Sequence, residues 1–542
     1  MGQGAPVNPI RRALLATPLA LAACERTREA AYDGRWLGAN AERGHRLRGP
    51  SVGEPAVTKR AGAIVVGAGI AGLAAARALM RGGVDDVRVL DLEDEAGGNA
   101  RGHAIAGLAC PLGAHYLPVP GEAAHEVAEW LEEIGLRRIE NGHAVHDERH
   151  LCHSPQERLF IDGQWHDGLL PPVEALPAAQ RAGTTAQYRR FATLVTDLGR
   201  DGAFAIPTTR SRWNPTLDAL DATPFAAWLD TQRLDAPALR WYLDYCCRDD
   251  YGAGSDAVSA WAGLHYFASR HGFHPPGDGG EEREGVFTWP EGNAWLARRL
   301  ARPLADRVFT GHVALRVREE RHAAEVDLWN ERERRIERWV APQVLLAVPL
   351  FVASRLLESP PDSLAAAARA MNWSPWLVAN LHLAEPLADR GGAPPSWDNV
   401  RYGSASLGYG DAMHQSTRPF AGPTVLTAYW AFGAATAEQT RTRRAELLAS
   451  AWSASARPVV EDLAAAHRDL PGKVARIDLM RYGHAMAVPV PGVRSSAALR
   501  ALGESAGRVQ FAHADLSGYS VFEEAFFHGH RAGTRIAALL HA

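Results

Sequence analysis

The stretch Ala63–Arg77, which reads AIVVGAGIAGLAAAR, decides the fold of this chain. A short apolar run enters the glycine turn GAGIAG at 67–72, and an alanine-rich helical pattern leaves it. Gly67 permits the tight turn, Gly69 lets the backbone approach a pyrophosphate, and Gly72 lets the helix pack closely on the strand. The stretch therefore predicts a strand, a turn and a helix that together bind a dinucleotide.

The new helix and the next strand complete this predicted site. The helix opens at Ile70 and Ala71, where free N–H groups and the helix dipole face the phosphates. The second strand, Val87–Leu90, ends in Asp91, about where a carboxylate accepts hydrogen bonds from a ribose. A GxGxxG turn alone is a weak signal, and a glycine-rich turn in an ordinary α/β protein is the alternative. Strand, helix and carboxylate in register favour the nucleotide site.

Later motifs indicate which nucleotide is bound. Gly97-Gly98 and Arg101 follow Asp91 closely, Leu112–Tyr116 reads LGAHY, and Arg508–Asp515 reads RVQFAHAD ahead of a helical stretch. With these motifs the chain resembles the flavin-containing amine oxidase superfamily, which includes monoamine and polyamine oxidases and the related desaturases. The resemblance covers about residues 61–542 in pieces, and it implies FAD as the cofactor.

The resemblance also assigns residues to the cofactor. In the family the double glycine and its arginine embrace FAD, an acidic residue matching Asp515 meets the ribityl–pyrophosphate part, and a valine like Val313 meets the adenine. The run Val344–Pro349 matches a further family signature. The implied FAD-binding residues are Gly67, Gly69, Ile70, Ala71, Gly72, Asp91, Gly97, Gly98, Arg101, Gly113, Ala114, His115, Tyr116, Val313, Asp515 and Phe522.

Composition sets the outer bounds. A length of 542 residues allows two or three domains, and 46% hydrophobic with 22% charged residues is ordinary for a globular protein. The net charge of −4 gives no reason to expect a nucleic-acid partner. Lysine is almost absent, because Lys59 and Lys473 are the only two among 58 basic residues.

The N-terminus reads as a targeting segment. Arg11-Arg12 precedes the apolar run Ala13–Ala23, which is too short to span a bilayer. Leu21–Cys24 resembles a bacterial lipobox, and the paired arginines resemble a twin-arginine signal. We expect a signal peptide at 1–23 and a lipid anchor at Cys24 on the periplasmic face of a bacterial membrane. A misassigned start or a cytoplasmic tail is the alternative.

The rest of the chain is predicted to form two domains. Residues 24–60, polar and rich in Gly and Arg, read as a tether. An FAD-binding Rossmann-like domain is expected from the discontinuous segments 61–120, 285–349 and 476–542. A mixed α+β substrate-binding domain is expected from segments 121–284 and 350–475. The polar run 273–284 is either an entrance loop or a plain surface loop, and we expect Cys246-Cys247 to be buried helix residues rather than a redox pair.

The sequence departs from the family near the reactive part of the flavin. Many family oxidases place a lysine there, bonded through water to flavin N5, and alignment by eye puts Val378 at its position. No register restores the lysine, since the chain has none between Lys59 and Lys473. Its loss favours a dehydrogenase that uses another electron acceptor, unless an arginine or a water substitutes.

The candidate catalytic residues are His484 and Tyr482, in a motif that the family brings to the flavin ring. The aromatic walls of the monoamine oxidase cage are replaced by Ala485 and Val521, which puts a simple arylalkylamine pocket in doubt. His484 is interpreted as a flavin partner, a base or an attachment point, with a structural histidine as the alternative. Carboxylates that could hold a cationic amine are Asp249, Asp250, Glu523 and Glu524, although we expect Asp249-Asp250 to pair with surface arginines.

The sequence therefore predicts an exported FAD-dependent oxidoreductase. The first hypothesis is oxidation of the C–N bond of a polyamine-like or other primary or secondary amine, by hydride transfer to flavin. The acceptor is a quinone, a redox protein or another molecule that the sequence does not identify. The alternatives are a desaturase-type flavoenzyme with an apolar substrate, and a redox-inactive flavoprotein that acts as a binding factor.

Overall fold

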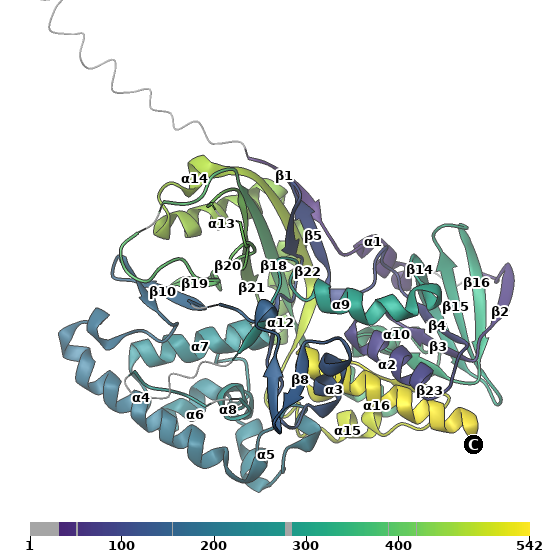
Figure 1. Cartoon of the computed structure of the whole chain (residues 1–542). Coiled ribbons are helices and arrows are strands. Elements are labelled where there is room, and N and C mark those ends of the chain that lie inside the picture. Colours follow the sequence, from purple (N-terminus) through teal and green to yellow (C-terminus); the bar gives the residue numbers. More distant parts are fainter. Residues whose placement is uncertain are drawn as a thin grey trace, which may run out of the picture.

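The computed structural model describes residues 32–49, 53–153, 155–270, 272–276, 285–388, 390–418 and 420–542. The signal peptide, the arginine pair, Cys24 and the first part of the predicted tether lie outside these residues. So does most of the predicted entrance loop. The described chain forms two halves that lie side by side, each built around its own large sheet (Figure 1).

The first half is organised around a five-stranded sheet, and we call it the five-stranded half. All neighbouring strands in this sheet are parallel. In spatial order its strands are β13 (Val308–Phe309), β4 (Val87–Leu90), β3 (Ala63–Val66), β17 (Val344–Leu346) and β23 (Val509–Phe511). These strands come from the beginning, the middle and the end of the sequence.

The apolar run that opens the glycine turn forms the central part of this sheet. Ala63 and Val65 of β3 face one core, while Ile64 and Val66 face the other. A parallel strand buried on both faces reads as a continuous apolar run, which is why this segment showed no alternation. The helices of the first core are α2 (Ile70–Arg81), α3 (His125–Glu133), α9 (Ala294–Ala301) and α16 (Phe522–His541).

The opposite face of the sheet packs against further helices and a small second sheet. The helices are α10 (Leu350–Leu356), α11 (Asp362–Ala370) and α15 (Ala497–Gly503). The second sheet is β14 (His312–Glu319), β15 (Ala324–Asn330), β16 (Arg335–Ala341) and β2 (Val57–Arg60). Both faces of the parallel sheet are thus covered, and the predicted α/β fold class is confirmed.

The other half is built on an eight-stranded sheet, and we call it the eight-stranded half. Its strands in spatial order are β1 (Asp33–Leu37), β22 (Val474–Val488), β18 (Asn372–Leu383), β21 (Thr424–Ala431), β20 (Tyr409–Asp411), β19 (Asp398–Arg401), β10 (Glu157–Ile161) and β11 (Gln164–Asp167). Its helices are α4 (Ala178–Leu198), α5 (Pro215–Asp221), α6 (Phe225–Thr231), α7 (Pro237–Tyr251), α8 (Ala260–Ala268), α12 (Ala437–Ala449), α13 (Trp452–Ala466) and α14 (Leu470–Lys473).

Further short elements lie between the main elements along the chain. They are α1 (Ala41–His45) and the strand pairs β5 (Gly102–Ile105) with β6 (Leu108–Pro111), β8 (Arg137–Glu140) with β9 (His143–His146), and β7 (Tyr116–Pro118) with β12 (Val286–Thr288). Cys246 and Cys247 are free, buried residues of α7, as expected. Within the described part of the chain, we find no helix that combines the length and apolar character needed to cross a membrane.

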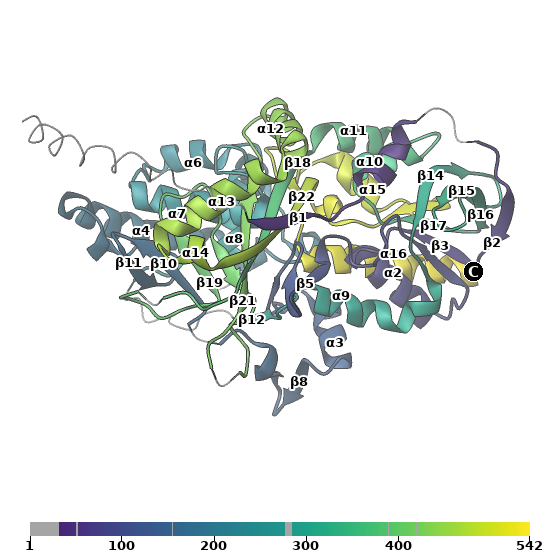
Figure 2. The same ribbon diagram turned by 90° about the horizontal axis from the view of Figure 1, so that it is seen from above.

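The prediction of a tether at 24–60 is wrong for residues 32–49 and 53–60, which the structure describes. Strand β1 runs parallel to β22 at the edge of the eight-stranded sheet, and β2 runs parallel to β16 (Figure 2). Polar composition suggested a linker, but an edge strand needs only one apolar face to pack, so its sequence stays largely polar. The boundary at 476 also differs, because β22 belongs to the eight-stranded sheet up to Val488.

Candidate active site

The glycine turn after β3 has an open side. A Cβ on Gly72 would stand 1.8 Å from the Gly67 carbonyl oxygen, so Gly72 is needed for close packing within the turn. Gly67 has a φ of +105°, a conformation that favours glycine. A Cβ on Gly69 would meet only the Cα of Gly98, at 4.0 Å. Gly69 therefore borders open space at the N-terminus of α2, where a pyrophosphate fits the free N–H groups.

The double glycine lies against this turn. Gly97 and Gly98 have φ values of +128° and +58°, and the Gly97 N–H donates to the Ala68 carbonyl at 2.8 Å. A Cβ on Gly98 would come within 3.2 Å of the Gly69 Cα. The two glycine segments thus form a narrow backbone cradle that side chains would fill.

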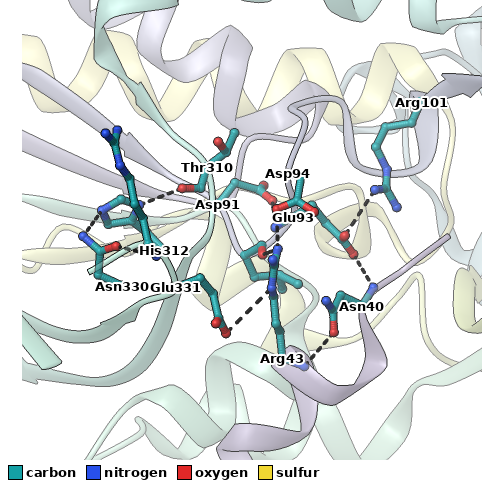
Figure 3. Close-up of polar contacts among 12 residues, drawn as sticks. Asn40, Arg43, Asp91, Glu93, Asp94, Arg101, Thr310, His312, Asn330 and Glu331 are labelled. Atoms are coloured by element: carbon teal, nitrogen blue, oxygen red, sulfur yellow. Dashed lines mark hydrogen bonds and ion pairs between the residues drawn. The ribbon is translucent and has the colours of Figure 1, made fainter. Parts of the chain in front are cut away.

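Asp91 and Arg101 are held at the two ends of the loop that follows β4 (Figure 3). One Asp91 carboxylate oxygen accepts from the Ala68 N–H at 2.6 Å, and the other accepts from the Glu93 N–H at 2.8 Å. Burial raises the pKa of Asp91 despite these bonds. The Arg101 guanidinium pairs with Glu93 at 3.2 Å and donates to the Gly98 carbonyl at 3.1 Å.

The predicted C-terminal contacts take different forms. Asp515 is fully buried, and its Oδ2 accepts from the Leu350 N–H at 2.9 Å and from the Trp373 indole at 3.1 Å. Its Oδ1 accepts no hydrogen bond, and the His513 ring nitrogen lies 3.1 Å from it. Phe522 stacks on Trp130 in the core, with ring centroids 5.9 Å apart. Val313 is a buried residue of β14 that pairs with Trp329.

The turn Leu112–Tyr116 is fixed from the eight-stranded sheet. The Tyr482 hydroxyl donates to the Leu112 carbonyl at 2.9 Å, and the Tyr429 hydroxyl donates to the Gly113 carbonyl at 3.1 Å. Ala114 is exposed although the residues on either side of it are half-buried. The main chain of the turn is thus hydrogen-bonded on both sides of Ala114, and the small side chain of Ala114 is left exposed.

An aromatic wall extends from this turn. The His115 ring stacks on Tyr429 with centroids 4.5 Å apart and also contacts Trp397 at 5.3 Å and Tyr116 at 5.0 Å. Tyr116 meets Trp397 edge to face at 5.8 Å. Desolvation lowers the pKa of His115 to about 3, so its imidazole is neutral at ordinary pH.

A group of carboxylates lies beyond the aromatic wall, and we call Glu157, Asp249 and Asp398 the acidic group. Desolvation, then neighbouring Asp250, raises the pKa of Asp249 to about 7. Desolvation, then Asp249 and Glu157, raises the pKa of Asp398 well above its ordinary value. The same negative charges act on Tyr116, whose hydroxyl pKa is raised first by burial and then by Asp249.

The expectation that Asp249-Asp250 pairs with surface arginines is therefore wrong. Asp250 is 5% exposed and pairs with the enclosed Arg270 at 3.4 Å. The neighbouring Arg248 is used elsewhere, because it pairs with Asp244 at 2.9 Å. Sequence reasoning missed Glu157 and Asp398, since each lies at the start of a different strand and neither belongs to a local motif.

The structure does not bring His484 to this acidic group. Its ring stacks on Phe351 of α10 with centroids 4.5 Å apart. Desolvation, then Arg444 and Arg355, lowers the pKa of His484 to about 3. The cationic surroundings would oppose a protonated state, so the proposed role as a base for the amine has no support here.

The neighbouring motif residues have separate roles. Ala485 turns its carbonyl oxygen to the Asn99 amide at 2.6 Å, next to the double glycine. Glu524 is enclosed in α16, where it accepts from the Thr208 N–H at 2.6 Å and from the Tyr519 hydroxyl at 3.2 Å. Glu523 is buried in the same helix turn. The glutamates of α16 therefore serve the interior rather than the acidic group.

The comparisons with known proteins agree with this arrangement. A sequence model of the family described as flavin containing amine oxidoreductase matches residues 70–537, and the chain belongs to that family. Among solved structures, putrescine oxidase bound to putrescine superposes with a TM-score of 0.63 at 19% identity, covering 89% of this chain and 100% of the other. Cyclohexylamine oxidase from Brevibacterium oxydans IH-35A gives a TM-score of 0.63 at 18% identity, with the same coverage.

More distant structures share the fold as well. A CLA-producing fatty acid isomerase from P. acnes has a TM-score of 0.57 at 14% identity, covering 88% of this chain and 98% of the other. A search of curated protein sequences gave no match. At these identities the structural likeness establishes the fold, while the family match establishes the chemistry of the cofactor.

The protein is thus an FAD-dependent oxidoreductase, and its residues fit that cofactor. The open side of Gly69 and the narrow double-glycine cradle suit a dinucleotide. FAD supplies a hydride acceptor when bound, and the protein supplies position, exclusion of water and electrostatics.

Proposed function

We propose that the protein oxidises a cationic, polyamine-like amine at its C–N bond, with FAD as hydride acceptor. The observation that carries this proposal is the acidic group beside the aromatic wall. A desolvated cluster of carboxylates is unfavourable unless cations compensate it, and Arg270 pairs with Asp250 at 3.4 Å. A substrate ammonium group would stabilise the ionised forms of Asp249 and Asp398.

The aromatic wall suits the same substrate. Tyr and Trp rings attract a cation over their faces, and the attraction grows when the site is desolvated. Tyr116 and Trp397 would flank an alkylammonium chain that reaches from the acidic group toward the turn at Ala114. Its reacting amine must be neutral, so a substrate with a second, charged amine fits both ends of the site.

We propose a dehydrogenase rather than an oxidase. Val378 lies in β18, buried and paired across the sheet with Tyr429, whose hydroxyl reaches Gly113. A lysine at this position would face the site, but valine cannot supply a charge. The two lysines of the chain are bound elsewhere, Lys59 to Glu337 at 2.7 Å and Lys473 to Asp469 at 2.8 Å.

The two alternative functions, a desaturase and a redox-inactive flavoprotein, predict a different environment around the flavin. A desaturase with an apolar substrate needs an apolar tunnel, and desolvated carboxylates such as Asp249 and Asp398 would disfavour that substrate. A redox-inactive flavoprotein needs an obstructed flavin face, whereas Ala114 is exposed. Both rivals predict that amines leave the flavin spectrum unchanged.

The decisive test is anaerobic bleaching of the flavin with α,ω-diamines and with monoamines of matched length. We expect diamines to bleach the flavin at lower concentration than monoamines. Asp398→Asn should weaken the apparent affinity for diamines about tenfold, as loss of a charge-assisted contact does. Asp362→Asn, on the exposed start of α11, is the matched control. Failure of every amine to reduce the flavin would overturn the proposal.

We also propose export and lipidation at Cys24, on the strength of Arg11-Arg12 and Leu21–Cys24. This would place the protein at the periplasmic face of a bacterial membrane, in contact with it only through the anchor. A fatty-acid analogue should label the parent protein and not Cys24→Ala. Equal labelling of both proteins would contradict the proposal.

A further inference from the structure

The segment 38–48, which we call the strap, joins the edge of the eight-stranded sheet to the five-stranded half. It leaves β1 at Gly38, where the chain passes so close to Met480 that a Cβ would stand 1.7 Å from its sulfur. It then forms α1 and packs Leu47 on the core of the five-stranded half. The family match begins at residue 70, so the strap lies outside it.

The strap is hydrogen-bonded to the loop that follows β4 (Figure 3). The Asn40 N–H donates to the Glu93 carboxylate at 2.9 Å. The Arg43 guanidinium donates to the Leu92 carbonyl at 2.9 Å and to the Asp94 carboxylate at 2.8 Å. The Arg43 side chain is only 16% exposed, so its bond to the Leu92 carbonyl is partly shielded from water, whereas its bond to Asp94 is exposed.

The same loop carries groups that face the cofactor site. Glu93 uses its second oxygen to hold Arg101 at 3.2 Å, and its own N–H donates to Asp91 at 2.8 Å. The loop ends at Gly97, whose N–H is bonded to the glycine turn. A continuous set of contacts thus runs from the strap through Glu93 to Asp91 and Arg101.

We propose that the strap holds the loop 91–98 in its FAD-binding conformation and slows the release of FAD. Arg43 and Asn40 are positioning residues in this proposal, because they act through Leu92, Glu93 and Asp94. A loop that must open for the nucleotide to leave opens less often when it is bonded from outside. The inference rests on the cofactor alone and is independent of the proposed amine substrate.

The test uses the FAD-loaded full chain and its variants. Arg43→Ala should release FAD about tenfold faster than the parent protein. The release rate is measured from the recovery of flavin fluorescence after dilution of the FAD-loaded protein. Arg43→Lys should restore part of the retention, because an ammonium can still donate to Leu92 and Asp94. Arg46→Ala is the matched control, since Arg46 belongs to the strap but bonds Glu331 at 3.3 Å and covers Trp329 instead of the loop.

Thermal unfolding of the FAD-free proteins separates retention from general stability. We expect Arg43→Ala and Arg46→Ala to unfold at similar temperatures without FAD and to differ in FAD release. Equal release from these two variants, or release from Arg43→Ala at the parent rate, would overturn the proposal. If Arg43→Ala does not fold, Asp94→Asn serves instead, because the Asp94 side chain is 79% exposed. It should accelerate release by a smaller factor, and an unchanged rate would again overturn the proposal.

Discussion

Gly529 of α16 lies directly on the main chain of Ala71 in α2, and a Cβ on Gly529 would stand 2.0 Å from the Ala71 carbonyl oxygen. The contact repeats one turn later, where a Cβ on Gly533 would be 2.4 Å from the Ala75 carbonyl oxygen. The last helix of the chain is therefore packed at backbone contact on the helix that the glycine turn begins (Figure 1). The orientation of α2 toward the cofactor depends on this packing.

Gly529→Ala should destabilise the protein by about 1–3 kcal/mol, because α16 must move away from α2 to admit the methyl group. The better helix propensity of alanine offsets only part of this cost. Chemical denaturation of the FAD-free protein measures the change. Gly183→Ala, at an exposed position of α4 where a Cβ would meet nothing within 4 Å, is the control for propensity alone, and an equal effect of the two changes would contradict the packing argument.

Gly69→Ala and Gly72→Ala should have different consequences although they lie in the same turn. Gly69 borders open space, so its alanine variant should keep the stability of the FAD-free protein and lose FAD affinity. A Cβ on Gly72 would stand 1.8 Å from the Gly67 carbonyl oxygen, so the Gly72→Ala variant should unfold more easily. Thermal unfolding without FAD and titration with FAD distinguish the two outcomes. Retained affinity in Gly69→Ala would argue against a pyrophosphate at this place.

Asp249→Asn should make the substrate-free protein more stable than the parent protein at high pH. The folded-state pKa of Asp249 is raised from 3.8 to about 7, so the folded protein binds the proton more tightly than the unfolded chain. The contribution of this group to the free energy of unfolding is therefore fully present below pH 3.8 and is lost as the pH rises to about 7 and above. Unfolding curves of the two proteins should coincide near pH 4 and separate toward pH 8. A difference in the free energy of unfolding that stays constant from pH 4 to pH 8 would contradict the raised pKa of Asp249.

His484→Asn should leave the pH dependence of kcat/KM unchanged between pH 5 and 9. The His484 imidazole has a pKa of about 3 and carries no charge in this range. Any ionisation seen near pH 7 should instead disappear in Asp249→Asn, because Asp249 is the group with a pKa of about 7. Loss of the ionisation in the His484 variant would restore the histidine as an acid–base residue.

Oxygen should be a slow electron acceptor for this enzyme. A fixed cation near the flavin stabilises the negative charge that builds during oxygen reduction, and Val378 supplies none. Loss of one such electrostatic group typically costs about 10²–10³ in rate. Stopped-flow mixing of the reduced enzyme with aerated buffer should show slow reoxidation, and a quinone or dye should react faster. Reoxidation at the rate of a typical oxidase would contradict the dehydrogenase proposal.

The sequence predicted the parts of the fold that depend on local patterns. The strand, turn and helix of Ala63–Arg77 were recognisable because neighbouring residues alone determine them. Strand β1 was missed because its partner β22 lies more than 400 residues away and its own composition is polar. Parallel pairing at such separation leaves no local trace.

The candidate site shows the same division. The glycines of the cofactor cradle belong to compact motifs, and the structure places Gly69 beside Gly97 and Gly98. Asp249 was a candidate from the sequence, but the acidic group as a whole could not be predicted, because Glu157, Asp249 and Asp398 come from β10, α7 and β19 and meet only after folding. The role of His484 could not be chosen from the sequence, since a motif gives position along the chain but not the charges around a side chain.

The backbone contact between α2 and α16 has a consequence for biosynthesis. The glycine turn emerges from the ribosome early, yet the edge strand β23 and the helix that covers α2 are among the last residues made. Until then the face of α2 that packs on α16 has no cover. We therefore expect stable FAD retention only after the last helix has been made, and a chain truncated before Val509 should not retain FAD.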